Sequence, residues 1–86
     1  MTDDNNLKAV CGQMDTAIRR LTGYIGPICD DDILQDLGLD SLGLVDLHSA
    51  LSDAGYAGIA FSDFFTHYTF GSLAERIATL QERTQA

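Results

Sequence analysis

The most informative segment of the chain is residues 36–42, Asp36-Leu37-Gly38-Leu39-Asp40-Ser41-Leu42, because a serine stands there where a helix is predicted to begin. Gly38 interrupts the preceding segment, and either Asp40 or Ser41 can cap the helix that follows by accepting the N–H groups of its first turn. The start of a helix carries unpaired N–H donors and a partial positive charge, which favour a phosphate group. The serine is therefore well placed to carry a phosphodiester.

The spacing of apolar residues predicts an all-α fold with three longer helices, one short helix and a long first loop. We expect helices over about residues 5–21, 41–54, 62–66 and 70–82 in a single domain that covers residues 1–86. The inward stripe of the first helix is Leu7, Val10, Cys11, Met14, Ile18 and Leu21. The inward face of the last helix is Phe70, Leu73, Ala74, Ile77 and Leu80, with Thr69 as its cap.

The connection between the first two long helices, from about residue 23 to 40, is longer than most connections in a compact domain. We expect five apolar residues to hold it against the core: Ile28, Ile33, Leu34, Leu37 and Leu39. The run Asp30–Asp32 can cap a single helical turn that extends through Gln35. A calcium loop that begins at Asp30 is excluded, because Gln35 replaces the sharp-turn glycine and Ser41 replaces the bidentate glutamate.

The second long helix has two lines of apolar residues. The line Leu44, Leu47 and Leu51 is spaced to face the core. Leu42 and Val45 form another line, which either packs under the long loop or faces a partner protein. We favour the partner, because spare apolar surface beside a modifiable serine suits helix-in-groove recognition.

Two further features of the sequence give structural expectations. Gly43, early in the second helix, either lets a partner or a bound group approach closely or is simply tolerated there. Ser62 is the expected cap of the short helix. All four phenylalanines lie within ten positions, and we expect them to fill the core: Phe61, Phe64, Phe65 and Phe70.

The charge and the cysteines limit the partners and the compartment. The formal net charge of −8, from 13 acidic and 5 basic residues, argues against nucleic acid and anionic membranes. The charge either favours basic protein surfaces or merely keeps a small protein soluble, and it gains meaning here because Asp40 and Asp46 flank the serine. Cys11 and Cys29 have no framework spacing, and the sequence shows neither a signal peptide nor an apolar run long enough to span a membrane. We expect a cytoplasmic protein with reduced thiols, with Cys11 in the core and Cys29 partly exposed.

The sequence does not predict an enzyme. A nucleophile elbow would need glycine where Leu39 stands. His48 is two helical turns beyond Ser41, about 10 Å along the helix axis, which is too far to deprotonate the hydroxyl. We interpret His48 and His67 as packed or surface residues. Zinc-ligand spacing, a phosphate-binding glycine loop and a dinucleotide fingerprint are all missing from the sequence.

The segment DLGLDSL and the amphipathic helix after it resemble the phosphopantetheine attachment site of acyl and peptidyl carrier proteins. The similarity continues through FSDFFTHYT, residues 61–69, and FGSLA, residues 70–74. These two segments are similar to the short third helix and the start of the last helix in carriers of polyketide and non-ribosomal peptide pathways. The resemblance covers roughly residues 30–80. The chain departs from the family at Tyr68, where proline is usual, and at Gly43, where better-studied carriers have a larger or acidic residue.

The resemblance implies that Ser41 carries 4′-phosphopantetheine, transferred from coenzyme A by a separate phosphopantetheinyl transferase that uses magnesium. The thiol of this group would hold acyl or aminoacyl intermediates as thioesters, and partners would recognise Asp40, Leu42, Val45 and Asp46. The other implied partners are an acyl- or aminoacyl-loading enzyme, an acyltransferase or a ketosynthase, each bound transiently by a monomer.

The alternative is a small helical adaptor that binds partner proteins without a prosthetic group and uses Ser41 only as a helix cap. Among carriers, the DFFTHYT segment and the few acidic residues of the second helix favour a pathway-specific carrier over a fatty-acid carrier. The sequence does not identify the cargo.

Overall fold

The computed structural model describes residues 4–56 and 58–84 of the chain. The elements, in order, are α1 (Asp4–Thr22), the 3₁₀-helix η1 (Leu34–Leu37), α2 (Ser41–Asp53), α3 (Asp63–Thr66) and α4 (Phe70–Thr84). The predicted fold class is confirmed, because the described residues form three long helices, one short helix and a long first connection. The observed bounds differ from the expected ones by one or two residues at some helix ends.

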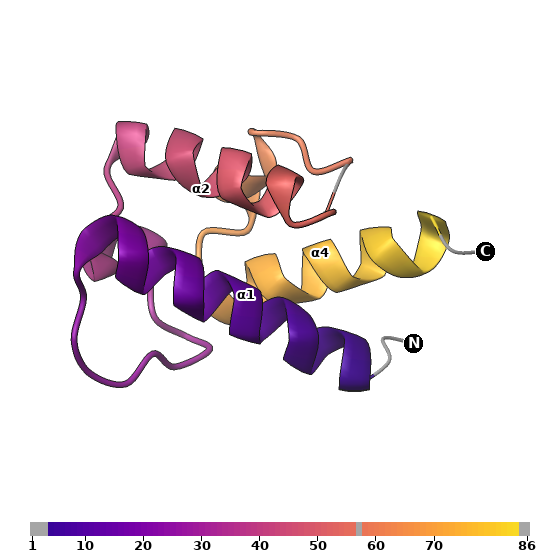
Figure 1. Cartoon of the computed structure of the whole chain (residues 1–86), viewed down its shortest axis with the longest axis horizontal. Helices are drawn as coiled ribbons and strands as arrows, with labels where there is room; N and C mark the ends of the chain where they lie inside the picture. The colour runs from indigo at the N-terminus through magenta and orange to yellow at the C-terminus, as the bar shows by residue number, and fades with distance from the viewer. Residues whose placement is uncertain (1–3, 57, 85–86) are drawn as a thin grey trace.

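The helices form a small bundle that measures 35 × 22 × 21 Å (Figure 1). Helix α1 packs against both α2 and α4, and α3 packs against α4. The start of α1 and the end of α4 lie at the same end of the bundle, whereas α2 begins at the opposite end (Figure 1). The first turn of α2 is therefore far from both ends of the described chain.

One apolar core joins the three long helices. Helices α1 and α2 each contribute three fully buried side chains at the predicted spacing: Val10, Met14 and Ile18, and Leu44, Leu47 and Leu51. Helix α4 contributes Phe70, Leu73, Ala74, Ile77 and Ala78. Three predicted inward residues lie at the margin instead, because Leu7, Cys11 and Leu80 are only partly buried. Leu21 is 38% exposed, so the inward stripe of α1 ends before it.

The first part of the long connection is held by Arg19. Helix α1 is followed by Gly23, which adopts a left-handed conformation with φ of 72° and donates its N–H to the Arg19 carbonyl at 2.9 Å. The Arg19 guanidinium pairs with Asp15 at 2.6 Å and donates to the carbonyl oxygen of Gly26, also at 2.6 Å. The sequence patterns of this segment did not predict this contact.

The second part of the connection is held by the start of α4. The N–H of Phe70 donates to the Asp32 carbonyl at 2.9 Å, and the N–H of Gly71 donates to the Asp30 carbonyl at 2.7 Å. A Cβ atom on Gly71 would lie 2.7 Å from the Cβ of Asp30 and 3.0 Å from its carbonyl oxygen. Only glycine at position 71 permits this close approach.

One of the five predicted anchors of the connection was wrong. Leu34, Leu37 and Leu39 are buried and Ile28 packs partly buried against the core, but Ile33 is 38% exposed. Ile33 has extended backbone dihedrals and forms an isolated antiparallel bridge with Thr69. Successive side chains of an extended segment point to opposite sides, so Leu34 faces the core and Ile33 does not.

Two of the predicted helix caps were also wrong. The η1 turn begins at Leu34 with no side-chain cap, and Asp32 Oδ2 accepts instead from the N–H of Cys29 at 2.8 Å. Ser62 makes no capping bond because its own backbone is helical, whereas a cap residue needs extended dihedrals. The Thr69 cap is confirmed, since its hydroxyl accepts from the N–H of Ser72 at 3.2 Å.

The phenylalanines do not all fill the core as predicted. Phe64 and Phe70 are buried, Phe61 is partly buried, and Phe65 is 55% exposed. Consecutive residues of a helix point about 100° apart, and the four-residue helix α3 packs with Phe64 toward the core, which leaves Phe65 on its exposed side.

Candidate functional site

Residues 38–40 precede α2, and each has a different role in forming the start of this helix. Gly38 closes η1 in a left-handed conformation with φ of 101°, and Leu39 is fully buried. Asp40 is extended, and its Oδ1 accepts from the N–H of Gly43 at 2.7 Å. Asp40 is therefore the cap of α2, and Ser41 is the first residue of the helix rather than its cap.

Ser41 is exposed and its hydroxyl is not used by the fold. Within residues 4–56 and 58–84, no hydrogen bond involves this hydroxyl. The residue borders an open hollow of about 420 Å³ that is also lined by Gln35, Gly38, Leu39 and Asp40. A reagent can reach the hydroxyl, and the first turn of a helix stabilises a negative charge placed there.

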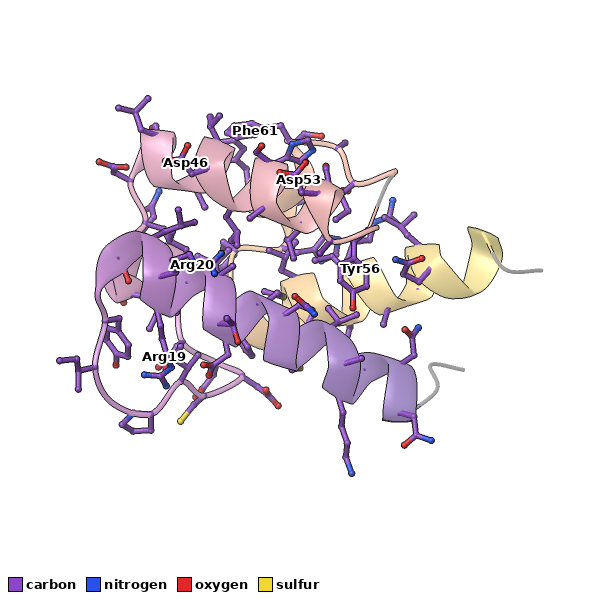
Figure 2. All side chains as sticks on the ribbon, in the orientation of Figure 1. Arg19, Arg20, Asp46, Asp53, Tyr56 and Phe61 are labelled. Atoms are coloured by element: carbon purple, nitrogen blue, oxygen red, sulfur yellow. The ribbon has the colours of Figure 1, made fainter. Side chains whose placement is uncertain are left out.

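The exposed line of α2 faces solvent rather than the long connection. Leu42 is 75% exposed and Val45 is 49% exposed, which excludes the alternative that they pack under the loop. Asp46 is also exposed, and Figure 2 shows it on α2, apart from Arg19 and Arg20 on α1. The four residues predicted to meet a partner are thus exposed, with Asp40 at the cap of α2 and Leu42, Val45 and Asp46 on its first two turns.

Gly43 has a structural role that the sequence patterns did not reveal. A Cβ atom at this position would lie 3.2 Å from Cδ2 of Leu39 and 3.3 Å from Oδ1 of Asp40. Both distances are tighter than ordinary contacts, and the Asp40 atom is the one that caps the helix. The small residue therefore makes room for the cap and for the buried leucine beneath it.

The histidines are engaged by local contacts. His48 donates from Nε2 to the Ile59 carbonyl at 2.7 Å, and its ring meets the Phe64 ring edge-on at a centroid distance of 5.8 Å. His67 Nδ1 lies 2.8 Å from the hydroxyl oxygen of Ser72. The structure therefore gives neither ring a contact with Ser41.

The two thiols differ in exposure, since Cys11 is partly buried and Cys29 is exposed. Cys11 and Cys29 are unpaired, and burial raises the pKa of the Cys11 thiol, to which the nearby Asp30 and Glu75 carboxylates add. Cys11 is only partly buried, whereas we had expected it in the core. Among the described side chains, no group of three or more His, Cys, Asp or Glu residues could hold a metal ion. Within the same part of the chain, every helix is too short or too polar to cross a membrane.

The arrangement is that of a small helical protein with a modifiable hydroxyl at a helix start. The sequence model of the family described as "Phosphopantetheine attachment site" matches residues 13–77. The chain belongs to this family, and its members carry a covalently attached 4′-phosphopantetheine group. Comparison with curated proteins and with solved structures finds no significant match.

The protein is accordingly a carrier protein that works with a phosphopantetheinyl transferase and with the enzymes of its pathway. The start of α2 fits the prosthetic group, because it combines an exposed hydroxyl, an adjoining hollow and a helix start that favours a phosphate. When bound, the group supplies a thiol that forms thioesters.

Proposed function

We propose that Ser41 is the residue that carries 4′-phosphopantetheine. The main support is the division of labour at the start of α2, where Asp40 caps the helix and leaves the Ser41 hydroxyl exposed beside an open hollow. A serine that capped the helix would have its oxygen occupied by a backbone N–H. Here that oxygen is available to the transferase.

The protein acts as a carrier and does not catalyse its own loading. A catalytic serine needs a base within hydrogen-bond reach. His48, the histidine nearest in sequence, is held by the Ile59 carbonyl and by the phenylalanine rings beside it. Proton removal from Ser41 is therefore left to the transferase. The carrier contributes a tether, which replaces diffusion of the intermediate by a high effective concentration at each partner enzyme.

The partner enzymes recognise the exposed first turns of α2. Leu42 and Val45 offer apolar area, and Asp40 and Asp46 place negative charge at its edge. Each complex has to dissociate before the next enzyme can act, so these contacts serve transient binding by a monomer.

The cargo is an acyl or aminoacyl group, and the pathway is polyketide or hybrid polyketide and non-ribosomal peptide biosynthesis. The protein works in the cytoplasm. The support for this pathway is the resemblance of residues 61–74 to carriers of such pathways, and the presence of only two acidic residues in α2, Asp46 and Asp53. The partners are then a loading enzyme, an acyltransferase or a ketosynthase.

The test is the intact mass after incubation with coenzyme A, magnesium and a broad-specificity phosphopantetheinyl transferase. The wild type should gain one phosphopantetheine, and Ser41→Ala should gain none while keeping its helical circular dichroism. Ser49→Ala is the matched control, because Ser49 is another exposed serine of α2 and should not be needed for loading. If Ser41→Ala were still loaded, the attachment site would be another hydroxyl.

The alternative of a helical adaptor without a prosthetic group does not fit the family match over residues 13–77, although the exposure of Leu42 and Val45 would also serve an adaptor. An adaptor would gain no mass when folded and treated with an active transferase. It would also keep its partners after Ser41→Ala.

A further inference from the structure

A groove lies between the first half of α1, the middle of the long connection and the start of α4, and we call it the α1–α4 groove. It has a volume of about 550 Å³, which is within the usual range for ligand-binding sites. The residues that line it include Leu7, Cys11, Asp30, Asp31, Gly71 and Glu75. None of the described residues that line it lies on α2 or α3, so the groove is separate from the hollow beside Ser41.

The α1–α4 groove combines apolar surface with unpaired carboxylates. Leu7 and Cys11 are partly buried against the core and form an apolar wall. The side chains of Asp30, Asp31 and Glu75 belong to exposed residues, and within residues 4–56 and 58–84 these carboxylates form no hydrogen bond and no ion pair. Burial raises the pKa of the Cys11 thiol, and Asp30 and Glu75 raise it further, so both carboxylates lie near the same wall.

The surroundings of the groove disfavour three kinds of ligand. An anion is disfavoured because the first four N–H groups of α4 are already bonded to oxygen atoms of the chain, and carboxylates surround them. A metal ion is disfavoured because no three acidic, histidine or cysteine side chains of the described residues are arranged to hold one. A second copy of the chain carries the same net charge of −8 and is repelled. A ligand that carries several positive charges, spaced apart, remains.

We propose that the α1–α4 groove docks a basic segment of a partner protein, which presents two or more lysine or arginine side chains. The methylene stems of these side chains lie along Leu7 and Cys11, while their charged ends reach the carboxylates. Lys8 is the one basic residue among the described residues that line the groove, so it leaves two of the three negative charges for the partner. Charge complementarity of this kind speeds association and fixes the register of the bound segment.

The role of the groove rests on the proposed function. Helix α2 begins at the end of the bundle opposite the start of α1, whereas the groove lies along the first half of α1 (Figure 1). A short segment bound there leaves Ser41 and the exposed line of α2 uncovered. The carrier is thus held by one protein while α2 meets the enzymes of the pathway in turn, which raises the effective concentration at each of them.

The experiment titrates the isotope-labelled full chain with a blocked Arg-Leu-Arg tripeptide at low ionic strength and records amide spectra. The amides of residues 7–11, 30–31 and 71–75 should shift, and those of residues 41–46 should not. The double variant Asp31→Asn/Glu75→Gln should raise the Kd about tenfold, because it removes two exposed charges from the contact. The double variant Asp36→Asn/Asp53→Asn is the matched control, since both residues are exposed and lie outside the groove; its Kd should stay within about twofold of the wild-type value.

Three results of the titration would overturn the proposal. The first is a set of shifts confined to residues 41–46, which would place the peptide on α2. The second is an unchanged Kd for Asp31→Asn/Glu75→Gln, with the spectrum showing a folded variant. The third is equally tight binding of putrescine, a small diamine of the same charge, which would assign the groove to a polyamine rather than to a protein segment.

A loading assay tests whether the groove and Ser41 are used independently. Saturating peptide should change the rate of phosphopantetheine transfer equally for the wild type and for Asp31→Asn/Glu75→Gln. Inhibition that occurs with the wild type and is abolished by the double variant would show that the bound segment covers Ser41, against the proposal. The assignment of Ser41 is tested separately, by loading without peptide and its loss in Ser41→Ala.

Discussion

The outer surfaces of two regions of the bundle differ in charge and in what they expose. Helices α1 and α4 carry all five basic residues of the chain: Lys8, Arg19, Arg20, Arg76 and Arg83. The region formed by η1, α2 and α3 carries none, and it exposes Leu42, Val45 and Phe65. A helix in a small bundle needs only one apolar face to pack, so apolar residues beyond that face are free to meet other molecules. Under the proposed function, the exposed apolar residues of the second region are the ones available to meet partner enzymes.

Helix α2 has both a buried and an exposed line of apolar residues, and this makes a direct comparison possible. Leu47→Ala should lower the free energy of unfolding by about 2–5 kcal/mol, because Leu47 is fully buried and its truncation leaves a cavity. Leu42→Ala should change it by no more than about 0.5 kcal/mol, because Leu42 is 75% exposed. Urea denaturation followed by circular dichroism measures both values. A large loss of stability in Leu42→Ala would show that Leu42 packs in the core.

Two glycines extend the comparison to the long connection, which the start of α4 holds in place. Gly71→Ala should destabilise the protein by about 1–3 kcal/mol, because the new methyl group would press on the Asp30 backbone. Gly12→Ala is the matched control on α1, since a Cβ atom there meets nothing within 4 Å. It should stabilise the protein by about 0.5–1 kcal/mol through its higher helix propensity. Equal shifts of the thermal midpoint would show that the contact between Asp30 and Gly71 does not hold the long connection.

The smallest expected effect concerns the two thiols. Cys29 is exposed on the long connection, whereas burial, with Asp30 and Glu75 nearby, raises the pKa of the Cys11 thiol. At pH 8 less of Cys11 is therefore present as the reactive thiolate, and iodoacetamide should modify Cys29 several-fold faster. The rate at Cys11 should increase as the pH rises toward its raised pKa. Peptide mapping after timed alkylation measures both rates, and equal rates at pH 8 would contradict the partial burial of Cys11 in the structure.

The sequence predicted features that depend on neighbours along the chain. The apolar spacing predicted the inward line of α2, and the segment around Gly38 predicted where that helix begins. Of the two residues proposed as its cap, only the structure identified Asp40. Local patterns failed at Ile33 and Phe65, because hydrophobicity alone does not tell which of two adjacent apolar residues faces the core. That choice depends on the orientation of the segment against helices far away in the sequence.

The sequence by itself determined the all-helical class, the spacing of the inward residues and the position of Ser41 at the start of a helix. These features follow from helical periodicity and from local breaks such as Gly38, so they need no knowledge of the packing. Only the tertiary structure decided that Leu42 and Val45 face solvent, that Gly71 touches Asp30, and that Leu7, Asp31 and Glu75 line one groove. Each of these facts joins residues from different elements or depends on what covers them, and such contacts exist only once the helices have packed.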